Sequence, residues 1–301
     1  MNNLIKFVFI FFLVTLNTNA EENIMILKLK NGDVEIKLLS IPGLREPAVT
    51  DYAISAVESR FDAMLIMDIE EKNNYNLITT SSADNVHVKN TVNNFKSRGL
   101  DSSFAAAYFP DVVMLDPTTV TNVRVPPSVA VLGAFALNDA VGFPWFAPAG
   151  FTRGVLSDVL FSAVRFNKTN LDDLYEADIN PITSFPGTSL VVFGQKTLLA
   201  AQSSLDRVNV RRLLIDIRRS VRIVADSILF EPNREETLAR FNALVNPILQ
   251  SVQDRSGLFF VVERENKGGN CKRFEGITNY PKGRGGKTVH VPMGVWGKDI
   301  K

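Results

Sequence analysis

The chain has 301 residues, of which 46% are hydrophobic and 22% charged, and its formal net charge is +1. This composition is typical of a soluble globular protein of one or two domains, without a general attraction to nucleic acid or acidic membranes. One cysteine, Cys271, excludes an internal disulfide framework and a cysteine-only zinc site, and the two histidines, His87 and His290, lack the spacing of metal ligands.

Residues 1–20 have the pattern of a secretory signal peptide. Lys6 provides the positive charge, an apolar run follows from Phe7 to Leu16, and small residues surround Ala20. The run is too short to cross a bilayer of about 30 Å as a helix. The alternative is a buried hydrophobic N-terminal segment.

Residues 21–40 are expected to form a β-hairpin, because Asn31-Gly32 separates two runs of partly alternating apolar residues. This stretch resembles the opening strands of cyclophilin-type prolyl isomerases. The residues that form the active site of that family have no recognisable counterparts downstream. Because of residues 1–40, the alternative hypothesis is a secreted prolyl isomerase-like fusion or a secreted binding domain.

Strand and helix patterns alternate in the next part of the chain, which predicts an α/β fold with a layered sheet and packed helices. Two apolar runs are typical of strands that are buried on both faces. The expected elements are an extended segment at Ile41–Asp51, a helix at 52–60, a strand at 61–69, a loop at 70–90, a helix at 90–98, and a strand at 103–115 broken at Pro110.

A helix is then predicted at 129–139 with Ser128 as its N-cap. Residues 143–154 contain prolines and several aromatic side chains, which indicates either a loop pinned by buried aromatics or an interaction surface. A short helical turn is expected at 171–174 and a strand at 190–194.

The strongest helical pattern begins at Val208. One face is apolar, through Val210, Leu214, Ile217, Val221, Val224 and Ile228. The helix is expected to stop before Pro232, and a second helix to start with Asn233 as its cap and Pro247 as a kink. A last strand is predicted at 258–262. Residues 264–301 are expected to be a poorly ordered, basic, glycine-rich tail, with a short strand at 288–291.

No catalytic constellation, cofactor site or metal site is recognised. The segment from Pro281 to Thr288 is similar to a phosphate-binding loop but fails in both spacing and context. Asp111 and Asp116 lie at the ends of a predicted strand and could form a carboxylate pair, although such residues are more often turn formers.

The most informative polar feature is a group of arginines on the long helix, namely Arg211, Arg212, Arg218, Arg219 and Arg222. One interpretation is a solvated face with ion pairs to Asp216 and Asp226. The other is docking on an acidic partner surface. No aromatic residues stand between these arginines, which argues against binding of single-stranded nucleic acid.

Several motifs, in order, resemble the tail sheath proteins of contractile phages and phage-like devices over about residues 41–263. They are Ile41–Asp51, Val125–Ser128, Phe143–Gly150, Ile179–Ile182 with Phe185–Gly187, and Val208–Leu213 continuing to Phe230–Asn233. The signal-like N-terminus and the basic tail depart from this pattern.

The resemblance implies a fold like the sheath C-terminal domain and a non-enzymatic subunit. Such a subunit polymerises around the tail tube and contracts to drive the tube through the host envelope. Its implied partners are further copies of itself, the tail tube protein and the baseplate, with no cofactor, nucleic acid or membrane. It would be part of the virion tail and assemble in the host cytoplasm, which conflicts with a signal peptide at residues 1–20. The candidate tube or subunit contacts are then Arg211, Arg212, Arg218, Arg219 and Arg222.

Overall fold

The structure is a computed structural model that describes residues 36–79, 86–116 and 118–255, together with the backbone of three short strands further on. The chain divides into two compact units. The first contains Met1–Ala200 and Arg207–Asn209, and the second contains Ala201–Asp206 and Val210–Lys301. The signal-like segment, most of the predicted hairpin and most of the predicted basic tail lie outside the described residues.

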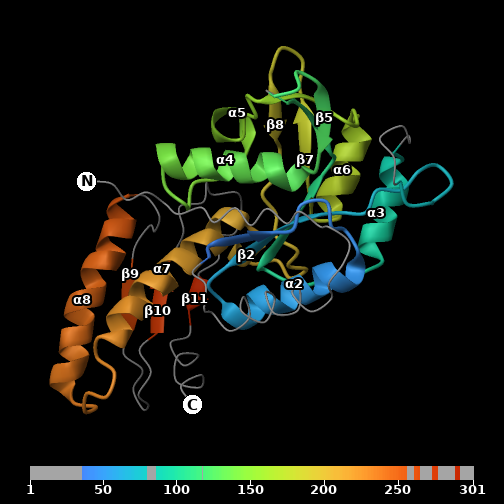
Figure 1. Ribbon diagram of the computed structural model, residues 1–301. Coiled ribbons are helices and arrows are strands. Elements are labelled where there is room, and N and C mark those ends of the chain that lie inside the picture. The colour runs from blue at the N-terminus through green and yellow to red at the C-terminus, as the bar shows by residue number, and fades with distance from the viewer. Residues whose placement is uncertain are drawn as a thin grey trace. The chain divides into compact units, whose positions relative to one another are not determined.

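The first unit is built on a five-stranded sheet with the order β1-β2-β3-β7-β8 (Figure 1). Its strands are β1 (Leu38–Ser40), β2 (Met64–Asp68), β3 (Ala105–Phe109), β7 (Ile179–Ser184) and β8 (Leu190–Val192). The first four are parallel, and β8 runs antiparallel to β7. Every residue of β2 and β3 is buried, as predicted for strands covered on both faces.

Helices cover both faces of this sheet, which confirms the predicted α/β class. They are α2 (Pro47–Arg60), α3 (Val88–Lys96), α4 (Pro127–Val141), α5 (Gly150–Arg153) and α6 (Lys168–Glu176). In Figure 1, α2 lies on one side of β2 and α4 on the other. The α6 helix packs against β7 and against α3.

Two predicted helix starts are wrong. The α2 helix begins at Pro47 rather than at residue 52, because proline suits the first position of a helix, where no N–H partner is needed. The α4 helix begins at Pro127, so Ser128 lies inside its first turn and is not the N-cap. The aromatic segment after α4 begins as a pinned loop, since the Phe143 and Trp145 rings stack at 4.9 Å and Trp145 is buried. Its last residues form α5, where the Phe151 side chain is exposed.

A second, three-stranded antiparallel sheet completes the first unit. It has the order β5-β4-β6, formed by β4 (Val112–Leu115), β5 (Asn122–Val125) and β6 (Val159–Ser162). The single strand predicted at 103–115 is therefore two strands in two different sheets, divided at Pro110, where a break was expected. Strands β5, β6 and β7 were not predicted.

The second unit contains most of the long helix α7 (Val208–Asp226) and all of α8 (Glu235–Asp254). The two helices share a small apolar core of Val221, Val245, Leu249, Ile217, Val224 and Phe241. The predicted stop before Pro232 is confirmed, but the N-cap of α8 is Arg234 rather than Asn233, and it makes no side-chain capping bond.

Beyond α8, three strands form an antiparallel sheet with the order β11-β10-β9. They are β9 (Val261–Arg264), β10 (Arg273–Gly276) and β11 (Val289–Val291). The strand predicted at 288–291 matches β11, whereas β10 lies in the segment that was expected to be poorly ordered. Within the described residues, no helix is both long and apolar enough to span a membrane.

The two sides of α4 provide a test of how this helix is oriented. Phe135 is fully buried and meets the Tyr108 ring edge-on at 6.4 Å, whereas half of the Leu137 side chain is exposed. We expect Phe135→Ala to lower the free energy of unfolding by about 3–5 kcal/mol, because it leaves a cavity in the core. The matched variant Leu137→Ala should cost less than about 1 kcal/mol. Urea denaturation measures both, and equal losses would contradict this orientation.

Candidate functional site: a buried charge cluster and the α7 arginines

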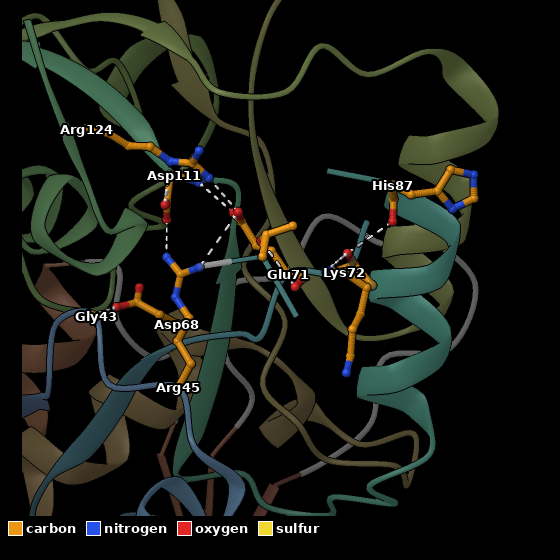
Figure 2. Close-up of polar contacts among 10 residues, drawn as sticks. Gly43, Arg45, Asp68, Glu71, Lys72, His87, Asp111 and Arg124 are labelled. Atoms are coloured by element: carbon orange, nitrogen blue, oxygen red, sulfur yellow. Dashed lines mark hydrogen bonds and ion pairs between the residues drawn. The ribbon is translucent and has the colours of Figure 1, made fainter. Parts of the chain in front are cut away.

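Four charged side chains from distant parts of the sequence meet in the first unit (Figure 2). Arg124 of β5 donates to two carboxylates, with Nη2 2.5 Å from Glu71 Oε2 and Nε 2.8 Å from Asp111 Oδ2. Arg45, from the connection between β1 and α2, bonds to Asp111, and its Nη1 lies 3.8 Å from Glu71 Oε2. We call these four residues the charge cluster. Each acid is thereby held by both arginines.

The charge cluster is largely removed from water, and its two positive and two negative charges balance. The Glu71 side chain is only 1% exposed. Burial, and after it the negative charge of Asp111, raises the pKa of Glu71 above its usual value, although Arg45 and Arg124 oppose this shift. The ionised form of Glu71 is therefore stable in the fold only because both arginines remain beside it.

A further buried carboxylate, Asp68 at the end of β2, joins two motifs that are far apart in sequence. It accepts hydrogen bonds from the Gly43 amide at 2.9 Å and from the Ser128 amide and hydroxyl, both at 2.8 Å. Burial raises the pKa of Asp68, although these hydrogen bonds oppose the shift. Asp68 thus occupies the amide-rich start of α4, a position that favours an acid, because Pro126 provides no cap of its own.

Residues of two other sheath-like motifs, Ile179–Ile182 and Phe143–Gly150, also form hydrogen bonds to distant parts of the chain. The Asn180 side chain donates to the carbonyls of Ala107 and Lys196 and accepts from the Lys196 amide, so it ties β7 to its neighbours. A Cβ at Gly194 would lie 2.7 Å from Asn180 Oδ1, so this close approach requires glycine. In the aromatic loop, Asn209 donates to the Trp145 carbonyl at 3.3 Å.

The charge cluster lies beyond the carboxyl ends of β2 and β3, where α/β proteins commonly bind ligands. Here the position is filled by carboxylates and arginines that pair with one another and join segments of the fold. Across the part of the chain that the structure describes, no group of three or more His, Cys, Asp or Glu residues could hold a metal ion. Asp116, which the sequence offered as a partner for Asp111, instead binds Thr118 and Thr119 in a turn.

The five arginines of α7 differ in their burial, so they do not form one solvated face. Arg212 is only 5% exposed. Burial lowers the pKa of Arg211 to about 10. Arg218 and Arg219 are half-buried, and Arg222 is exposed. Of the five, Arg222 is therefore the residue most open to an external partner.

Comparison with known proteins places these features in context. Over 135 residues, the chain is 36% identical to the tail sheath protein of Vibrio phage KVP40, a stretch that is 45% of this chain and 20% of that protein. It is 27% identical to the tail sheath protein of Enterobacteria phage T4 over 217 residues, which are 70% of this chain and 32% of that protein. The chain resembles contractile tail sheath proteins.

The fold agrees with this resemblance. The helical sheath of the anti-feeding prophage in its contracted state superposes with a TM-score of 0.60, at 22% identity, over 92% of this chain and 71% of that one. No protein-family model matches the chain. The chain spans between 20% and 32% of the length of these two phage relatives. The comparisons do not favour the prolyl isomerase or the secreted binding domain.

The charge cluster predicts unequal effects of removing its members. Glu71→Gln should lower the free energy of unfolding by less than Arg124→Met does, because the loss of its ion pairs is partly offset by the removal of a charge that burial disfavours. Arg124→Met should cost about 3 kcal/mol, because it leaves two buried carboxylates with one arginine. Chemical denaturation at neutral pH compares the two. A larger loss for Glu71→Gln would contradict this account of the charge balance.

The raised pKa of Glu71 also predicts a dependence on pH. Because its pKa is higher in the folded than in the unfolded protein, Glu71 contributes most to stability at pH values below 4.5, its ordinary pKa. That contribution is lost as the pH rises through the raised pKa. The stability of the wild type, relative to Glu71→Gln, should therefore fall from acid toward neutral pH. A difference that grows in the other direction would indicate a lowered pKa.

Proposed function

We propose that this chain is a structural subunit of the contractile tail sheath of a phage or phage-like device. In this role it polymerises around a tail tube and contracts to drive the tube through the host envelope. The observation that carries the proposal is the 36% identity to a phage tail sheath protein. Its partners would be further copies of the chain, the tail tube protein and the baseplate. It would act in the virion tail, after assembly in the host cytoplasm.

A non-enzymatic role agrees with the chemistry of the described residues. The most buried acids, Asp68 and Glu71, are engaged with backbone amides, a hydroxyl or arginines, and these contacts join elements of the fold. Four of the sheath-like motifs make contacts of this kind, namely Ile41–Asp51, Val125–Ser128, Phe143–Gly150 and Ile179–Ile182. We therefore assign these residues to shape and assembly rather than to turnover of a substrate.

We further propose that the arginines of α7 contribute tube or subunit contacts. Arg222 is the principal candidate, because it is exposed, and the half-buried Arg218 and Arg219 are secondary candidates. Arg211 and Arg212 would act mainly inside the fold. A guanidinium group suits an acidic partner surface, since it pairs with carboxylates through two parallel hydrogen bonds.

Electron microscopy of the full chain tests the proposed assembly. We expect rings or tubes when the purified protein is concentrated, or when it is mixed with the tail tube protein of the same particle. Sedimentation velocity should show the corresponding large species. A protein that stays monomeric under both conditions, while folded by circular dichroism, would overturn the proposal.

Charge reversal on α7 tests the partner contact. Arg222→Glu should weaken co-sedimentation with the tail tube by about five- to tenfold, because it replaces an attraction with a repulsion at the rim of the contact. Arg240→Glu is the matched control, since Arg240 is an exposed arginine on α8. Thermal unfolding should be unchanged in both variants. Equal co-sedimentation of the two variants would show that Arg222 is a solvated side chain that does not contact the tube.

A further inference from the structure

The connection between α7 and α8 exposes apolar side chains. Phe230 is fully exposed, and Leu229 beside it is 45% exposed. Phe230 also adopts a φ of 68°, in the left-handed region that bulky residues rarely occupy. Phe61 adopts the same conformation at the end of α2, so the backbone at Phe230 is that of an ordinary helix end. It is the full exposure of the Phe230 ring that makes it a candidate contact residue.

Acidic side chains stand beside this apolar pair. Glu231 follows Phe230 directly, and Glu235 and Glu236 form the exposed first turn of α8. The exposed Arg234 lies between them, so this segment carries three acids and one arginine. We call Leu229, Phe230 and these three glutamates the hairpin tip. Aromatic side chains with an apolar neighbour are frequent anchors in protein interfaces, and the surrounding charges select the partner. The hairpin tip therefore suits a surface that is apolar and bordered by positive charge.

The first unit carries exposed apolar side chains on β6 and exposed basic side chains shortly after it. Leu160 and Phe161 of this strand are 52% and 51% exposed, and β6 forms one edge of the β5-β4-β6 sheet. The exposed side chains of Arg165 and Lys168 follow shortly after the strand. The segment between them is held in place, because the neighbouring Phe166 ring lies 5.6 Å from the Phe109 ring. We call these four residues the β6 surface.

We propose that the hairpin tip of one subunit docks on the β6 surface of a second copy of this chain. The inference rests on the proposed sheath function. Both surfaces combine exposed apolar side chains with charge, and their net charges are of opposite sign. Three glutamates outnumber Arg234 at the hairpin tip, and Arg165 and Lys168 outnumber the exposed Asp158 beside β6. Because the two surfaces differ, the contact is heterologous, and a heterologous contact that does not close on itself produces an open helical array.

The size of the contact is consistent with an array rather than a free dimer. An aromatic side chain buries about 150–250 Å², whereas a stable specific interface buries about 1,200–2,000 Å² in total. Two or three apolar side chains on each partner therefore cannot hold a dimer in dilute solution. In a polymer, where other contacts already hold the subunits together, the same contact acts at a high effective concentration.

Site-specific photocrosslinking tests the contact directly. A benzoylphenylalanine at position 230 in the full chain should, after assembly and irradiation, join a second copy within residues 159–168, as mapped by mass spectrometry. The same probe at Leu244, an exposed position further along α8, should not. Assembly with crosslinks from position 230 to another region, or with none, would overturn the docking contact and leave the sheath function intact. Failure of the wild type to assemble at all would overturn both.

Charge reversal provides an independent test. Glu235→Lys combined with Glu236→Lys should raise the critical concentration for assembly roughly tenfold, because attractive rim pairs become repulsive. Arg165→Glu combined with Lys168→Glu should have a similar effect. The variant carrying all four changes should recover most of the loss. If that variant is as impaired as the two losses combined, the two surfaces do not meet.

Discussion

The balance of buried charge at Arg45, Glu71, Asp111 and Arg124 is the interaction on which the first unit most depends. A lone carboxylate at this depth would be strongly disfavoured, so the two acids require the two arginines beside them. The four residues come from the connection before α2, the segment that follows β2, the junction of β3 with β4, and β5. The ion pairs among these four residues therefore hold the five-stranded sheet and the three-stranded sheet of the unit together.

The motifs that make the chain similar to sheath proteins have a physical role in this arrangement. In Ile41–Asp51, Gly43 donates its amide to Asp68, Arg45 enters the charge cluster, and Pro47 starts α2. In Val125–Ser128, the Ser128 side chain meets the same Asp68. These segments are thus parts of one structural joint, although more than seventy residues separate them in the sequence.

Features that depend on local chemistry could be predicted from the sequence. The apolar run of β2 and the periodicity of α7 both correspond to the elements that the structure contains. Strand β7 could not be predicted, because Pro181 argues against a strand with neighbours on both sides, and yet β7 lies between β3 and β8. The β6 surface could not be predicted either, since it depends on how β6 pairs with β4.

The candidate site was less accessible to sequence reasoning than the fold. Arg45, Glu71 and Arg124 have no common spacing, and only the folding of the chain brings them together. Sequence reasoning directed attention to the arginines of α7 because they are close together in the chain. Their burial changes along the helix, from the buried Arg212 through the half-buried Arg218 and Arg219 to the exposed Arg222.

The passage of one short stretch, Ala105–Leu115, through both sheets of the first unit has a mechanical consequence. Strand β3 belongs to the five-stranded sheet and β4 to the three-stranded sheet, with only Pro110 and Asp111 between them. A pulling force on one sheet therefore reaches the other through covalent bonds and not only through side-chain packing. Asp111, at the midpoint of this link, is also gripped by two arginines. The two sheets of the first unit are thus coupled twice at one place, by the chain itself and by the ion pairs of Asp111.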